Sequence, residues 1–310
     1  MYGRIRRSSL ATKLLYKDRW FFAIRRRTIT TGSYCDTTGY EVLRPPRDRF
    51  YADPFLLKWK RQSYLFFEDY RYDKAKGLIS CMTLDNCGHP VATTMALERP
   101  YHLSFPFVFT WDGEIWMVPE TSTNRTIELY RARQFPQDWV REATLMCSLH
   151  ASDSVMLHYA NTWWLFTSIE DEETYCYKNL SLFFAQSPLG PWIAHPLNPV
   201  VGDAARARPA GTIFEDNGVL IRPGQDCSHS YGQAIQFNRI ETLDETHYQE
   251  RPVWKTTPDW SPHCFGTHTY NRNDDFEVLD GYTRDFDLYS KWLSLRGWMH
   301  SSHFRHRISA

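Results

Sequence analysis

The sequence predicts an all-β fold, a five-bladed β-propeller with about four antiparallel strands in each blade. Two observations carry this prediction. A hairpin pattern recurs five times along the 310 residues, with its copies opening at positions 53, 105, 153, 208 and 267. Aromatic residues, which favour strands, make up 16% of the chain. Steps of about fifty residues between four-stranded units are typical of propeller blades.

The first copy, residues 51–69, shows the hairpin pattern most clearly. An apolar run is followed by a polar break and by a second apolar run that ends in acidic residues. Asp53 opens the first strand and Glu68 closes the second. These two positions lie at the same edge of an antiparallel pair, so we expect two carboxylates at one end of this hairpin.

The other four copies repeat this layout. They cover residues 105–120, 153–168, 208–222 and 267–280. Asp112-Gly113, Ala160-Asn161 and Asn217-Gly218 provide residues suited to hairpin turns. Further short strands are expected near residues 78–84, 127–132 and 181–185. Each unit therefore holds about four strands.

The repeat predicts a ring of polar residues at one mouth of the central channel, because the first strand of each blade lines that channel. The expected ring residues are Asp53, Phe105, Asp153, Arg208 and His268. The closing residues of the second strands should return to the same face: Glu68, Glu120, Ser168, Arg222 with Gln225 and Asp226, and Asp280. Any one of them could simply satisfy backbone groups of the channel. Together, however, converging charges are costly to fold and usually mark a site.

The two ends of the chain flank this repeat. We expect residues 1–40 to form a basic arm and the first or closing strand, residues 41–290 the propeller, and residues 291–310 a tail packed on it or trailing from it. Residues 1–27 carry nine basic residues and one acid. This segment could contact an anionic membrane surface peripherally. We favour a solvated arm whose Trp20-Phe21-Phe22 begins an edge strand, because its apolar residues keep no clean helical period.

Composition excludes several classes of protein. Lysine plus arginine equals aspartate plus glutamate, at 36 each, which argues against a nucleic-acid partner. The seven cysteines form no Cys-x-x-Cys pair, so we expect reduced thiols in a cytoplasmic protein, and neither a disulfide framework nor a zinc site. The sequence shows no signal peptide and no apolar run of about 18 residues that could span a membrane.

The string Ala52-Asp53-Pro54-Phe55, taken with the five-blade period, resembles the five-bladed propeller glycosidases of the arabinanase, xylosidase and arabinofuranosidase group. This resemblance implies that Asp53 is the general base and that Asp153 orients the sugar and tunes a pKa. It also implies a central ion such as Ca²⁺ near His268. The acidic glutamate of that group does not carry over, because the corresponding blade opens with Arg208-Pro-Ala-Gly211.

A closer resemblance covers nearly the whole chain. The shared strings are Phe50–Phe55, His102–Phe107, Val118–Thr121, Phe135-Pro-x-x-Trp139, Gly190–Trp192, His195–Pro199, Arg208–Gly211, Arg222–Ser228 and Tyr231-Gly232. Together they resemble the propeller-like N-terminal domain of plant glucosamine inositolphosphorylceramide transferase and its stand-alone bacterial relatives. In the plant proteins the recognised transferase domain is a separate, C-terminal one.

The missing glutamate favours a glycosyltransferase that moves a sugar from a phosphate-activated donor, such as a nucleotide sugar, to a glycan or glycolipid acceptor. A hydrolase needs a carboxylic acid with a raised pKa for the leaving group, whereas such a transferase needs a base and cations for the phosphate. Asp53 would be the base, Arg208 and Arg222 would hold the phosphate, and His102 would add a donor. The other candidate substrate-binding residues are Glu68, Gln225, Asp226, Tyr231 and His268.

Two alternatives remain open at this stage. One is a hydrolase of a furanoside or pyranoside, with Asp53 as base and Glu120 as acid; Asp153 is a catalytic candidate in either enzyme. The other is a non-catalytic, sugar-binding propeller module.

Overall fold

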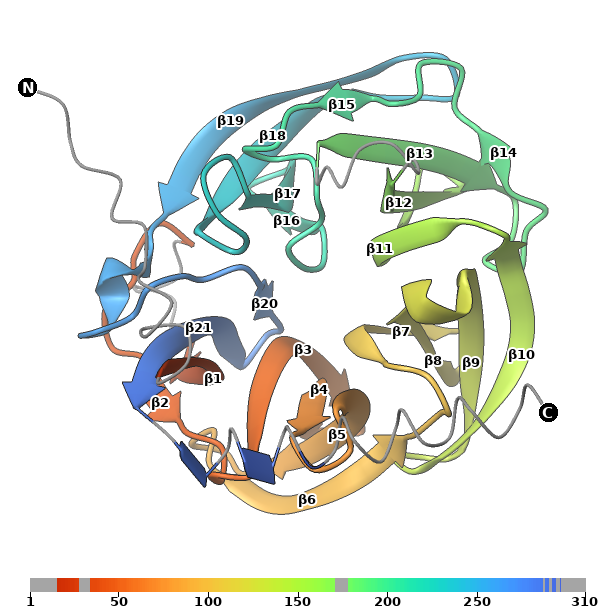
Figure 1. Ribbon diagram of the computed structural model, residues 1–310. Coiled ribbons are helices and arrows are strands. Elements are labelled where there is room, and N and C mark those ends of the chain that lie inside the picture. The colour runs from red at the N-terminus through yellow and green to blue at the C-terminus, as the bar shows by residue number, and fades with distance from the viewer. Residues whose placement is uncertain are drawn as a thin grey trace, which may run out of the picture.

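The computed structural model describes residues 16–27, 34–170 and 178–286, and a few residues between 288 and 296. Its strands form five antiparallel sheets arranged around a central axis (Figure 1). Four of the sheets have four strands, and the third blade gains a short fifth strand. The predicted five-bladed propeller is therefore confirmed.

Each blade runs from an inner strand beside the axis to an outer strand at the rim (Figure 1). Blade 1 contains β3 (Arg49–Trp59), β4 (Gln62–Arg71), β5 (Lys76–Leu84) and β6 (Pro90–Leu97). Blade 2 contains β7 (Ser104–Trp111), β8 (Glu114–Thr121), β9 (Thr126–Gln134) and β10 (Asp138–Cys147). Blade 3 contains β11 (His150–Tyr159), β12 (Thr162–Glu170), β13 (Asn179–Ala185), β14 (Ile193–Ala194) and β15 (Val201–Gly202). Blade 4 contains β16 (Phe214–Asp216), β17 (Val219–Asp226), β18 (Ala234–Leu243) and β19 (Tyr248–Thr256).

Blade 5 is assembled from both ends of the described chain. Its inner strands are β20 (Tyr270–Arg272) and β21 (Phe276–Phe286), and its outer strands are β1 (Tyr16–Arg26) and β2 (Glu41–Leu43). β1 pairs with β21 over eleven residues, from Tyr16 opposite Phe286 to Arg26 opposite Phe276. Trp20-Phe21-Phe22 thus lies on β1, which is not an edge strand as expected, because β2 pairs with its other side at residues 22–24. Two short 3₁₀ helices are also present, Ser122–Asn124 between β8 and β9 and Pro258–Trp260 between β19 and β20.

Residues 1–15 and most of the tail 291–310 lie outside the described part of the chain. The membrane contact of the N-terminal arm and the role of the C-terminal tail therefore stay predictions. No helix of the described part is both long and apolar enough to cross a membrane. No two of the six cysteines in that part form a disulfide with each other.

The core lies between neighbouring blades. Phe55 of β3 meets the ring of Phe105 of β7 edge to face, with 4.8 Å between centroids. Leu65, Phe66 and Phe67 of β4 are all fully buried, because both faces of this strand are covered by adjacent blades. The inner strands are therefore held rigidly from two sides, which fixes the ends that point into the channel.

A repeated β-bulge opens the first three blades. The register breaks between Ala52 and Phe55, between Ser104 and Phe107, and between Ser152 and Val155. The first residue of each bulge has a positive φ: 52° at Asp53, 43° at Phe105 and 55° at Asp153. Such backbone is uncommon without glycine, costs on the order of 1 kcal/mol and clusters at functional sites. At Asp53 and Asp153 the bulge directs a carboxylate toward polar partners at the channel, whereas the Phe105 ring packs against Phe55 in the core.

Candidate active site

Asp53 lies where blades 1, 2 and 5 meet. Its side chain is buried, with 5% of the residue exposed. The Oδ1 atom accepts a hydrogen bond from the Thr269 hydroxyl at 2.9 Å, and Oδ2 accepts one from the backbone N–H of Phe105 at 3.2 Å. The Nε2 atom of His268 is 3.7 Å from Oδ1. The structure therefore brings Asp53 and His268 together, as the repeat predicts, whereas Phe105 contributes only its backbone N–H and its ring lies in the core.

The pKa of Asp53 is raised from its ordinary 3.8 to about 6. Burial is the main cause, and the nearby Asp153 and Asp280 add to it. The His268 imidazole opposes the shift, because a positive neighbour stabilises the carboxylate. A carboxylate with this pKa is well matched to general base catalysis near neutral pH.

Asp153 is the second acidic member of the ring. Its Oδ2 atom accepts hydrogen bonds from Nε of Arg208 at 2.5 Å and from the side-chain amide of Gln225 at 2.6 Å. The same amide of Gln225 donates to the backbone carbonyl of Pro209 at 2.9 Å. These partners orient Asp153 and compensate its charge, so it is suited to holding a substrate or tuning a neighbour.

Glu120 approaches this pair from blade 2. Its Oε2 atom is 3.6 Å from Nη2 of Arg208 and has no hydrogen-bond partner, although the atom is buried. Burial raises the pKa of Glu120 well above its usual range, Asp153 raises it further, and Arg208 only partly offsets them. Glu120 therefore keeps its proton to a higher pH than an exposed glutamate does, which is the property of a general acid.

Glu68 and His102 form a neighbouring pair. The His102 Nδ1 atom accepts a hydrogen bond from the backbone N–H of Gly77 at 2.9 Å, which places the imidazole proton on Nε2, 3.5 Å from Oε1 of Glu68. Burial raises the pKa of Glu68 well above its usual range, and burial lowers the pKa of His102 to about 4. Glu68 and His102 thus lie beside the ring, on the side of blade 1.

Aromatic side chains adjoin the His268 imidazole. The Trp20 indole stacks on it with 4.0 Å between ring centroids and 18° between planes, and the Tyr231 ring meets it edge-on at 5.3 Å. Tyr231 is 40% exposed, and the Arg208 guanidinium lies 5.2 Å from the centre of its ring. Tyr231 thus offers an exposed ring beside buried carboxylates, as suits a sugar-binding residue. Sequence reasoning missed Trp20, because its position in the chain is far from every blade opening.

Arg222 does not join the ring. It is fully buried within blade 4, where its Nε and Nη2 atoms each donate to the Glu250 carboxylate at 2.7 Å. Nη2 also donates to the backbone carbonyl of Arg206 at 2.8 Å. The expectation that Arg222 holds a phosphate therefore finds no support, because its donors are already used inside the blade.

Asp226 likewise turns away from Gln225. Its carboxylate accepts hydrogen bonds from Lys255 at 2.6 Å and from the Ser228 hydroxyl at 2.6 Å. Side chains alternate between the two faces of a strand, so Gln225 reaches Asp153 while Arg222 and Asp226 share the opposite face of β17. Of the three residues predicted to reach the ring from β17, namely Arg222, Gln225 and Asp226, Gln225 does so.

The side chains around His268 include the groups that would have to hold the implied Ca²⁺. Potential ligand atoms of Asp53, His268 and Asp280 lie within 4.8 Å of one another. The Asp280 carboxylate, however, already accepts four hydrogen bonds, from the backbone N–H groups of Asp53, His268 and Thr269 and from Nδ1 of His268. These partners occupy its lone pairs. Ca²⁺ takes six to eight oxygen ligands, so these residues do not fit it as a resident ion.

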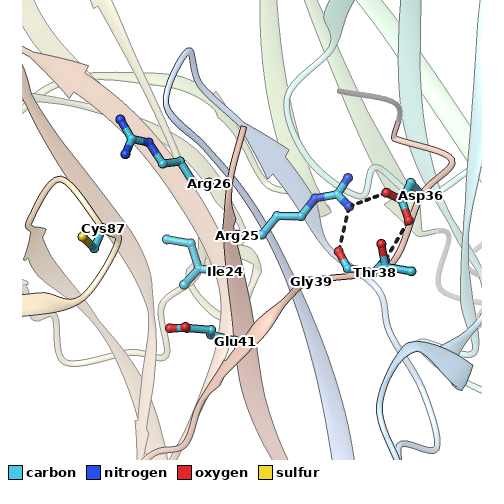
Figure 2. Close-up of a pocket in the computed structure, with 8 residues that line it drawn as sticks. All are labelled: Ile24, Arg25, Arg26, Asp36, Thr38, Gly39, Glu41 and Cys87. Carbon is cyan, nitrogen blue, oxygen red and sulfur yellow. Dashed lines mark hydrogen bonds and ion pairs between the residues drawn. The ribbon is translucent and has the colours of Figure 1, made fainter. Parts of the chain in front are cut away.

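A separate cavity of about 350 Å³ lies beside strands β1 and β2 of blade 5 and Cys87 of blade 1 (Figure 2). Its lining residues are Ile24, Arg25, Arg26, Asp36, Thr38, Gly39, Glu41 and Cys87. The buried Arg25 donates to Glu277 at 2.8 Å and to the carbonyl of Thr38 at 3.0 Å, and it lies 3.3 Å from Asp36. The charge of Arg25 is therefore compensated by residues of blade 5 and its flanking loop. We place the candidate active site at the ring, where buried carboxyl groups converge.

Comparison with solved structures agrees with the fold. A family 117 glycoside hydrolase from Zobellia galactanivorans superposes with a TM-score of 0.54 at 12% identity, covering 86% of this chain and 92% of that one. An exo-1,5-α-L-arabinanase from a bovine ruminal metagenomic library gives a TM-score of 0.52 at 9% identity, covering 76% and 93%. At such low identity the likeness shows the fold alone.

Sequence comparison is more specific. Residues 38–268 match the family model described as glucosamine inositolphosphorylceramide transferase 1, N-terminal. The protein of that name from Oryza sativa subsp. japonica is 38% identical over 209 residues, and the one from Arabidopsis thaliana is 36% identical over 210. These matches cover 66% of this chain but only 28% and 27% of the relatives. The chain therefore belongs to the family of the N-terminal region of glucosamine inositolphosphorylceramide transferase 1.

Proposed function

We propose that this protein is a carbohydrate-active enzyme that attacks a glycosidic bond by acid–base catalysis at the ring, with Asp53 as the base and Glu120 as the acid. The observation that carries this proposal is the contrast between the two carboxyl groups. Asp53 accepts hydrogen bonds from two donors and faces an imidazole. Glu120 has a buried oxygen without a hydrogen bond and a pKa raised well above its usual range. Such contrasting environments support Asp53 as the base and Glu120 as the acid.

The reaction then needs two proton transfers. Asp53 removes a proton from a water molecule, whose oxygen forms the new bond to the anomeric carbon. Glu120 gives its proton to the departing oxygen as the old glycosidic bond breaks. Asp153, held by Arg208 and Gln225, would orient the sugar, and Tyr231 would contact its apolar face.

Transfer of a sugar to an acceptor hydroxyl is the second candidate function. The name of the relatives supports it, since they are called transferases. A phosphate-activated donor would need cations for its leaving group. Arg208 is engaged by Asp153 and Glu120, and Arg222 by Glu250. These ion pairs favour an unphosphorylated glycoside as the substrate of the ring.

Two substitutions test these roles. Asp53→Asn should lower turnover by a factor of about 10² to 10⁴ with every substrate, because the base is lost. Glu120→Gln should strongly slow cleavage of glycosides with alkyl leaving groups and spare dinitrophenyl glycosides, whose leaving group needs no proton. Glu245→Gln, at an exposed turn, is the matched control.

The substrates should be panels of aryl glycosides, oligosaccharides and nucleotide sugars. Turnover that survives Asp53→Asn would exclude Asp53 as the base of either enzyme. Turnover of nucleotide sugars alone would favour transfer, whereas sugar binding without any turnover would identify a non-catalytic module.

A further inference from the structure

Asp280 is the most fully hydrogen-bonded carboxylate of the ring. It lies on β21 and is fully buried. Oδ1 accepts the backbone N–H groups of His268 and Thr269, both at 2.9 Å. Oδ2 accepts the backbone N–H of Asp53 at 3.2 Å and is 2.6 Å from Nδ1 of His268. One side chain thus connects the last blade to the bulge that carries the proposed base.

These contacts fix the orientation of the His268 imidazole. The short contact with Asp280 holds the proton on Nδ1, so Nε2 points toward Oδ1 of Asp53, 3.7 Å away. The stacked Trp20 indole covers one face of the same ring. Thr269, whose backbone Asp280 also holds, donates its hydroxyl to that Oδ1 atom. Asp280 therefore controls two of the groups that contact the Asp53 carboxylate.

We propose that Asp280 is a positioning residue, which acts through His268 and Thr269 to hold Asp53 in the orientation of a general base. This inference rests on the proposed function of Asp53. Asp280 and Trp20 both lie outside residues 38–268, the part of the chain that matches the family model. The site is therefore completed by strands β1 and β21, which flank the shared segment.

The charges around Asp53 give the expected direction of the pH effect. Among the neighbouring charges, the pKa of Asp53 depends most strongly on His268, Asp153 and Asp280. The other buried acids of the ring are Glu68 and Glu120. Burial lowers the pKa of His268, but Asp280 and Asp53 outweigh burial and raise it. Loss of the Asp280 charge should therefore lower the pKa of His268. The carboxylate of Asp53 is then no longer stabilised by a positively charged imidazole. Because His268 lowers the pKa of Asp53 more than Asp280 raises it, the pKa of Asp53 should rise.

Asp280→Asn tests this role. We expect kcat to fall about 10-fold or more with KM changed less than about 3-fold, and the acid limb of the kcat/KM profile to move to higher pH. Asp285→Asn, a matched change at the end of the same strand, should leave kcat and the profile unchanged. In the free protein, the NMR titration of the His268 imidazole, identified by its absence in His268→Gln, should move to lower pH in Asp280→Asn and stay in place in Asp285→Asn.

The NMR titration separates this inference from the proposed function, because it needs no substrate. If Asp53→Asn keeps its turnover, the proposed function fails, while a shifted His268 titration still supports the Asp280–His268 pair. An unmoved titration in Asp280→Asn would overturn the inference even in an active enzyme. If Asp280→Asn does not fold, as judged by circular dichroism, His268→Gln and Thr269→Val replace it. An unchanged acid limb in both of those variants would equally overturn the inference.

Discussion

Glu250→Gln would break the ion pair that holds Arg222 inside blade 4. The Arg222 side chain is fully buried, and both of its bonds to Glu250 are 2.7 Å long. The neutral amide leaves the guanidinium without a compensating charge. Tyr248, which donates its hydroxyl to Glu250 at 2.6 Å, keeps an acceptor only if the amide oxygen faces it. Loss of one partner of a buried pair costs about 3–5 kcal/mol.

This cost can be converted to a melting temperature. An unfolding entropy of about 2.1 cal/mol/K for each of the 310 residues gives about 0.65 kcal/mol/K for the chain. A loss of about 3–5 kcal/mol should therefore lower Tm by about 5–8 °C. Glu241→Gln is the control, because it removes the exposed partner of Arg251 at 2.6 Å and should cost about 0.2–1 kcal/mol.

Differential scanning calorimetry and urea unfolding would measure both variants, alongside the KM for any substrate found in the panels. The reasoning predicts a large stability loss for Glu250→Gln with little change in KM. If the Tm of Glu250→Gln falls no more than that of Glu241→Gln while KM rises tenfold or more, Arg222 serves the substrate after all and the structural explanation is refuted.

Three further predictions concern pH and packing. As a base, Asp53 should make kcat/KM fall as the pH drops below about 6. The raised pKa of Asp53 has the opposite effect on folding, because the folded chain holds this proton more tightly than the unfolded chain. The stabilisation is complete below about pH 3.8 and is lost as the pH rises through about 6. The difference in unfolding free energy between wild type and Asp53→Asn should therefore change by about 3 kcal/mol between pH 3 and 7. A flat difference would contradict the assigned pKa. Gly224→Ala should destabilise the protein by about 1–3 kcal/mol or more in urea unfolding, because the new Cβ would lie 2.2 Å from the carbonyl oxygen of Arg206; an unchanged midpoint would show that blade 4 can relax.

The sequence predicts the blade openings well because they depend on a local pattern. Turn residues and alternating apolar runs set the hairpin register, and that register alone decides which end of a strand points at the channel. Asp53, Asp153, Arg208 and His268 are therefore found together, and Glu120 joins them because its strand returns to the same edge.

The partner of each charge is harder to predict, because ion pairs form between residues that are distant in the chain. Arg222 and Asp226 look equivalent to Gln225 in the sequence, but Glu250 and Lys255 of the outer strand β19 claim them. The four hydrogen-bond donors to Asp280 come from Asp53 in blade 1 and from His268 and Thr269 beside blade 5, which are more than 200 positions apart in the chain. The positive φ of Asp53 and Asp153 is equally hidden, since neither residue is a glycine.

The pairing of β1 with β21 has a consequence for the time course of folding. Asp53 and His268 are 215 positions apart, and the sheet of blade 5, beside His268, needs residues 16–26 and 276–286 together. Contacts of such long sequence separation form late, because the intervening chain must first be ordered. During synthesis the ribosome must release almost the whole propeller before the base meets its imidazole. The contacts of Asp53 with His268 and Asp280 would therefore form last, and a nascent chain would lack the complete ring.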